Sequence, residues 1–131
     1  MPEHSSFDYA TVRVVPRVDR EEFVNVGVIL YCATRAFLGA RIVLTQDRTH
    51  VVQALSPGFD VSEVEDRLTL IPLICAGDPA GGPIAQIPQN ARFHWLVAPR
   101  STVIQTSPVH TGLSDDPEAE LEHLVKTMVG R

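Results

Sequence analysis

The segment from Arg92 to Gly112 holds most of the residues whose types could do chemistry. Ser107 and His110 are close together in it, and a hydroxyl beside an imidazole is the minimum for nucleophilic catalysis. A third group has to orient the imidazole, and Asp115 and Glu22 are the candidates. The chain contains no G-x-S-x-G and no H-E-x-x-H motif. Ser107 and His110 are therefore candidate catalytic residues that no motif supports.

Arginine supplies nearly all of the positive charge, since Lys126 is the only lysine. The guanidinium is a rigid fork that matches phosphate and carboxylate groups. Convergence of several arginines with polar neighbours would make a pocket for an anion or for an acidic segment of a partner. The alternative, that each is an independent surface arginine, stays open. The candidate binding residues are Arg13, Asn25, Arg92, Arg100, Ser101, Gln105 and His110.

No metal or cofactor is predicted. His94 and His110 have no third ligand at a suitable spacing. Cys32 and Cys75 stand in apolar runs without C-x-x-C spacing, so both are interpreted as reduced thiols of the core. The glycine-rich segment 77–90 lacks the lysine that a phosphate-binding loop requires.

The run from Phe23 to Cys32 is the expected central strand. Alternation places Val24, Val26, Val28 and Leu30 on one face, opposite Asn25 and Gly27. A buried amide without a partner costs on the order of 1 to 3 kcal/mol, so Asn25 is either a structural amide or a site residue. Gly27 predicts a bulge or the close approach of another group.

The other elements follow from periodicity and from turn residues. Three strands form an antiparallel meander, and a second hairpin turns at Pro99. Helices are expected between the third strand and the second hairpin, with a kink at Pro72. Another helix is expected after the hairpin, with a stop at Gly130. The strands are Tyr9–Val15, Phe23–Cys32, Phe37–Leu44, Arg92–Ala98 and Thr102–Thr106, and the helices are Asp47–Leu55, Ser62–Cys75 and Asp115–Val129.

These elements predict an α+β fold with an antiparallel sheet of about five strands and two main helices packed on it. Residues 7–131 are expected to form a single domain after a flexible N-terminus, 1–6. The sequence has no apolar run of membrane-spanning length and no secretory leader, so a cytoplasmic protein is expected. The net charge of -5 argues against a general nucleic-acid binder.

Two runs resemble a bacterial family known as domain of unknown function 3037. They are EFVNVGVIL at residues 22–30 and RFHWLVAPRSTVIQTSPVHTGL at residues 92–113, the second followed by DDPEAELEHL. The resemblance covers nearly the whole chain and implies no particular activity. It implies a stand-alone cytoplasmic bacterial protein whose gene often lies beside one for a HipA-like kinase-fold protein, and hence a partner or accessory role.

Three functional hypotheses follow. The first is a non-enzymatic interaction module that engages a protein through the sheet edge around Arg100 and His110. The second is an enzyme or sensor for a phosphorylated small molecule or nucleotide, with Arg92 and Arg100 binding the anion and His110 as acid or base. The third is nucleic-acid binding by a local arginine patch.

Overall fold

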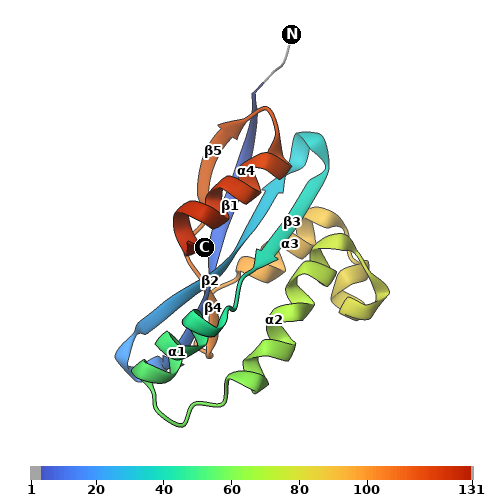
Figure 1. Ribbon diagram of the computed structural model, residues 1–131. Helices are drawn as coiled ribbons and strands as arrows, with labels where there is room; N and C mark the ends of the chain where they lie inside the picture. The colour runs from blue at the N-terminus through green and yellow to red at the C-terminus, as the bar shows by residue number, and fades with distance from the viewer. Residues whose placement is uncertain (1–3, 131) are drawn as a thin grey trace.

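The protein is represented by a computed structural model, and residues 4–130 are described. Within this range, five strands form one antiparallel sheet with helices on both faces (Figure 1). The predicted α+β fold and the meander of the first three strands are confirmed. The strands are β1 (Ser5–Arg17), β2 (Glu22–Cys32), β3 (Phe37–Ile42), β4 (Ile104–Thr106) and β5 (His110–Ser114).

The long strand β1 connects the whole sheet. It pairs with β2 along one side, and the sheet order is β3-β2-β1-β4. On its other side, residues 5–9 pair with β5 and residues 12–14 pair with β4. Ser5 and Ser6, from the segment expected to be flexible, pair with Ser114 and Leu113, while residues 1–3 lie outside the described residues.

Four α-helices are present in the described chain: α1 (Gln46–Leu55), α2 (Val61–Ala76), α3 (Gln89–Val97) and α4 (Pro117–Leu124). Apolar side chains of α1, α2 and α3 share one hydrophobic cluster with the sheet. Those of α4 and the π-helical turn η5 (Val125–Val129), which continues α4, form a second cluster on the other face. The two main helices that the sequence predicts are α2 and α4.

The strand predicted at Arg92–Ala98 is wrong, because these residues lie mostly in α3. Phe93 and Leu96 are buried in the first cluster, and their spacing suits one face of a helix. The apolar residues of so short a run fit a strand and a helix almost equally well, which is why alternation misled the prediction. The glycine-rich segment 77–90 before it is not irregular throughout, since it contains the 3-10 turns η3 (Pro79–Gly81) and η4 (Pro83–Gln86).

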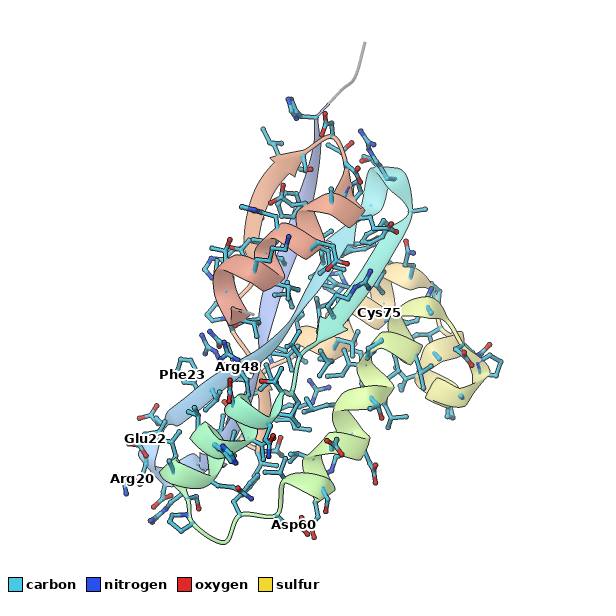
Figure 2. All side chains as sticks on the ribbon, viewed as in Figure 1. Arg20, Glu22, Phe23, Arg48, Asp60 and Cys75 are labelled. Carbon is cyan, nitrogen blue, oxygen red and sulfur yellow. The ribbon has the colours of Figure 1, made fainter. Side chains whose placement is uncertain are left out.

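The helix ends follow capping chemistry, with small shifts from the prediction. The carboxylate of Asp60 accepts the Ser62 backbone N–H at 3.0 Å, so α2 starts before Ser62 (Figure 2). Thr45, rather than Asp47, caps α1. Asp116 caps α4, as the acidic residues before Pro117 predicted, and Gly130 ends η5. Residues 110–114, where no strand was predicted, form β5.

The irregularity predicted at Gly27 is confirmed as a break in the register of β1 with β2. Val12 pairs with Gly27 and Arg13 with Asn25, which leaves Val26 opposite no residue. A Cβ atom at Gly27 would lie 2.5 Å from the Arg41 carbonyl oxygen, so the close approach is also real. The extra residue moves later side chains to the other face. Val24 and Val26 pack in the first cluster but Val28 and Leu30 in the second, which corrects the single apolar face predicted for them.

Candidate functional site

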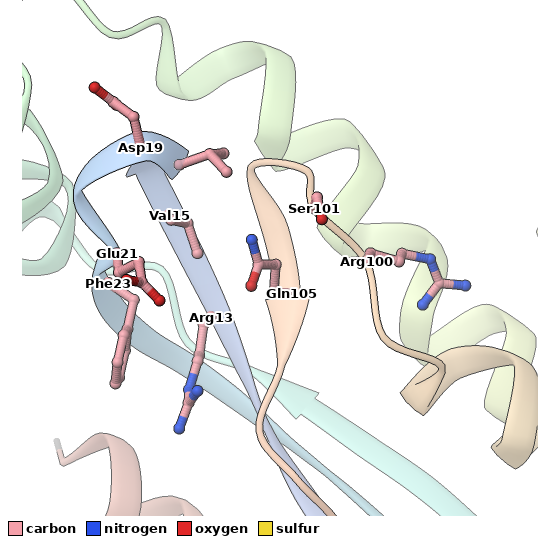
Figure 3. Close-up of a pocket in the computed structure, with 9 residues that line it drawn as sticks. Arg13, Val15, Asp19, Glu21, Phe23, Arg100, Ser101 and Gln105 are labelled. Atoms are coloured by element: carbon pink, nitrogen blue, oxygen red, sulfur yellow. The ribbon is translucent and has the colours of Figure 1, made fainter.

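Two cavities lie on either side of β4 and share Arg100 and Gln105 in their walls. The first, here the Arg13 cavity, has a volume of about 440 Å³ (Figure 3). The second, here the β4 groove, has a volume of about 310 Å³ and lies between β4 and the helices α2 and α3. The Arg13 cavity is lined by Arg13, Val15, Val18, Asp19, Glu21, Phe23, Arg100, Ser101 and Gln105. The β4 groove is lined by Arg67, Leu70, Ile71, Ile74, Trp95, Leu96, Arg100, Thr102, Ile104, Gln105 and Thr106.

Arg13 is one of the charged residues that line its cavity. Its guanidinium carbon lies 3.9 Å from the centroid of the Phe23 ring, a cation–π contact, and Gln105 is its cross-strand neighbour. Its Nε atom is buried and has no hydrogen-bond partner among the described residues. Loss of hydration on burial lowers the pKa of Arg13. Within residues 4–130, the Arg13 guanidinium therefore contacts an aromatic ring but no counter-ion.

Ser101 and Gln105 complete one wall of the Arg13 cavity. Gln105 donates through Nε2 to the Thr102 carbonyl at 2.9 Å, which fixes the amide and leaves its oxygen as an acceptor. The structure therefore brings together Arg13, Arg100, Ser101 and Gln105 of the predicted set. Arg100 contributes its stem only, because its guanidinium points away from Gln105 and Arg13 in Figure 3.

Arg92 and Arg100 both bind backbone carbonyls at helix C-termini. Arg92 Nη1 donates to the carbonyls of Ile74 and Cys75 at 2.9 and 2.8 Å, and its Nε donates to another carbonyl, that of Ile87. Arg100 donates to the carbonyls of Trp95, Leu96 and Ala98. Helix C-termini expose unpaired carbonyls and carry partial negative charge, so each arginine has a structural partner. Arg92 lines neither cavity.

Asn25 joins the sheet to the C-terminal turn. Its Nδ2 donates to the Met128 carbonyl at 3.2 Å, and its own backbone carbonyl accepts from Arg48 Nη1 at 3.0 Å. Its Oδ1 is buried without a partner among the described residues. These contacts fit the structural interpretation of Asn25, which lies outside the Arg13 cavity.

The hydroxyl of Ser107 is engaged by backbone. Its Oγ accepts the Thr11 N–H and donates to the Pro108 carbonyl, both at 2.9 Å, and Ser107 is buried. His110 in β5 pairs with Tyr9 in β1, and the centroids of their rings lie 5.4 Å apart. No hydrogen bond joins Ser107 to His110 within residues 4–130, so the geometry adds no support for catalysis by this pair.

Sequence patterns did not indicate the β4 groove. Trp95 and Leu70 are 43% and 40% exposed there, although both are large apolar residues. Arg67 lies one helical turn from Leu70 and makes no ion pair within the described chain. The available signal was Leu70, which falls outside the helical spacing shared by Val64, Leu68 and Ile71, together with the single tryptophan.

No group of histidine, cysteine and acidic side chains within residues 4–130 could hold a metal ion. In the same range, no helix combines the length and the apolar character needed to cross a bilayer.

The chain belongs to the family described as protein of unknown function (DUF3037), which matches residues 9–129. No curated protein and no solved structure matches the chain.

Proposed function

We propose that this member of the DUF3037 family is a non-enzymatic interaction module, and that an extended segment of a partner protein docks in the β4 groove. The observation that carries the proposal is an apolar groove beside an edge strand, with Trp95 and Leu70 exposed in it. Exposed large apolar side chains grouped in one groove are typical of an interaction site.

The edge of β4 favours an extended occupant. The Val103 carbonyl and the Ser107 N–H, on either side of Gln105, hydrogen-bond to β1. Backbone groups alternate in direction along a strand, so those of Ile104 and Thr106 face away from β1. The Ile104 carbonyl accepts from Thr102 Oγ1, which leaves the Ile104 N–H and both groups of Thr106 for a new strand. Strand addition at such an edge is a recurring mode of peptide recognition.

The charges of the groove favour an acidic occupant. Arg67 and Arg100 are the charged members of its described lining, and both are positive, whereas the chain as a whole carries -5. Acidic side chains flanking the apolar part of the segment would approach these two arginines. The rest of the surface would disfavour the same segment, which adds specificity.

Trp95 and Arg100 form a rigid anchor. The Arg100 guanidinium lies 4.7 Å from the Trp95 ring centroid and is held by three carbonyls. Tryptophan and arginine dominate binding energy at many interfaces, and side chains fixed before binding lose little conformational entropy.

The first partner to test is a HipA-like kinase-fold protein from the same genome, which the family resemblance implies, in the cytoplasm. The test is titration calorimetry of the two purified proteins, with Trp95→Ala and Arg67→Glu as groove variants. Leu113→Ala is the matched control, because Leu113 is exposed on β5 outside the groove.

Each groove variant should weaken binding at least about tenfold, while the control binds like the parent and all variants keep its melting temperature. Binding that both groove variants leave unchanged would contradict the groove. If the parent protein does not bind, the HipA-like kinase-fold protein is not its partner.

A further inference from the structure

The charges of the turn between β1 and β2 are paired with one exception. Arg17 contacts Asp19 at 3.3 Å and Arg20 contacts Glu22 at 3.2 Å. Figure 2 shows the second pair at this end of the sheet. Glu21 makes no ion pair and no side-chain hydrogen bond within the described chain. Its backbone is left-handed, with φ of 55°, and its side chain forms part of the Arg13 cavity (Figure 3).

Among residues 4–130, the Arg13 cavity therefore holds one cation and one anion that form no ion pair. Asp19 contacts Arg17, and the guanidinium of Arg100 points away from Arg13 and Gln105 (Figure 3), so neither contributes a free charge to this cavity. Arg13 and Glu21 face the same space without forming a salt bridge to each other. Arg13 and Glu21 therefore offer opposite charges to one cavity of about 440 Å³.

We propose that the Arg13 cavity binds a small zwitterion of the α-amino acid class. The carboxylate would bind the Arg13 guanidinium, whose planar fork suits two parallel hydrogen bonds. The ammonium would bind the Glu21 carboxylate. The apolar part of the ligand would lie on Phe23, which is 45% exposed, and on Val18. Ser101 and the oxygen of Gln105 offer further polar contacts.

The same charges disfavour other ligands. A phosphate or nucleotide would bring two or more negative charges toward Glu21, and like charges in a cavity repel. A simple cation would be repelled by Arg13 for the same reason. The cavity volume of about 440 Å³ is within the range of small-molecule sites.

The test is a thermal-shift and NMR titration of the full chain with the standard L-amino acids at millimolar concentration. For any amino acid that binds, its N-acetyl derivative removes the ammonium and its amide removes the carboxylate. The variants are Arg13→Gln and Glu21→Gln. Glu22→Gln is the matched control, because it removes one acidic charge from the same turn outside the cavity.

We expect at least one amino acid to raise the melting temperature and to shift backbone resonances near Arg13 and Glu21. The N-acetyl derivative and the amide should each bind at least about tenfold more weakly. Glu21→Gln should weaken the amino acid similarly but leave the N-acetyl derivative unaffected, and Glu22→Gln should change neither. Because Glu21 is exposed, Glu21→Gln tests the proposal even if Arg13→Gln fails to fold.

Absence of any shift with all of the amino acids would overturn the proposal. Equal affinity for the amino acid and both derivatives would overturn it too. The Arg67→Glu variant of the β4 groove should bind the amino acid like the parent, so the two proposals fail separately.

Discussion

At the scale of single residues, the surroundings of each guanidinium decide what the arginine does. Arg92 donates hydrogen bonds to the Ile74 carbonyl near the end of α2 and to the Ile87 carbonyl in the segment before α3. Arg100 closes the end of α3 and covers Trp95. Arg13 lies over Phe23 with its Nε unpaired among the described residues. Of these three arginines, Arg13 is the one that donates to no carbonyl of the described residues, and it is the one that we assign to ligand binding.

Cys75 gives a prediction at the same scale. Burial raises the pKa of the Cys75 thiol to about 12, and the nearby Arg92 opposes this only in part. The folded state then keeps a proton that the unfolded state releases above its ordinary pKa of 9.0. Stability from this thiol is therefore fully present below pH 9 and is lost as the pH rises toward 12. The free energy of unfolding should fall by up to about 1.4 kcal/mol per pH unit in that window.

Urea denaturation between about pH 8 and pH 11 checks this, with Cys75→Ala as the comparison. The variant loses packing at every pH, but its stability should depend less steeply on pH than that of the parent. Parallel pH profiles for the two proteins would show that the thiol does not contribute.

At the scale of elements, one extra residue in β2 supplies both faces of the sheet with apolar side chains. The irregularity at Val26 turns Val24 toward the first cluster and Val28 toward the second. Without it, a strictly alternating strand would keep both valines on one face. Gly27 permits the arrangement because the Arg41 carbonyl approaches where a Cβ would be.

Gly27→Ala should therefore lower the free energy of unfolding by about 2 to 3 kcal/mol, since the clash involves backbone and cannot be relieved by a side-chain rotation. Gly58→Ala is the control. Nothing lies within 4 Å of the position that its methyl group would take, but its φ of 88° makes the substitution cost about 1 kcal/mol. Urea denaturation of both variants provides the comparison. Equal losses would mean that the strand shifts to admit the methyl group.

At the scale of the whole molecule, β1 and β2 contribute side chains to both hydrophobic clusters. Val12 and Val24 belong to the first cluster, while Phe7 and Val28 belong to the second. Both clusters are therefore built on the same two strands, so separating these strands would expose both clusters. This arrangement favours a single cooperative transition.

The two cysteines test this cooperativity, because Cys75 lies in the first cluster and Cys32 in the second. Both thiols are buried and free. Pulse labelling in increasing urea, read for each cysteine by mass spectrometry, should give the same midpoint for both. Separate midpoints would show that one face of the sheet opens before the other.

Several elements of the fold follow from local features of the sequence. The meander depends on short connections, the start of α4 on acidic residues before Pro117, and the irregularity on Gly27 within a valine run. The first two features involve neighbours along the chain, and the third follows from the residue type, because a glycine in a strand leaves room for another backbone to approach. Their physical causes, turn geometry, helix capping and backbone clearance, can therefore be inferred from the sequence.

Tertiary contacts decided the rest. Arg13 and Gln105 pair between β1 and β4, and Ser101 lines the same cavity, whereas Asn25, Arg92 and His110 have other surroundings. Whether residues 92–97 form a strand or a helix depends on the core that receives Phe93. The β4 groove, and the cavity that Glu21 shares with Arg100 and Ser101, exist only once distant segments are packed, because their walls come from elements far apart in the sequence.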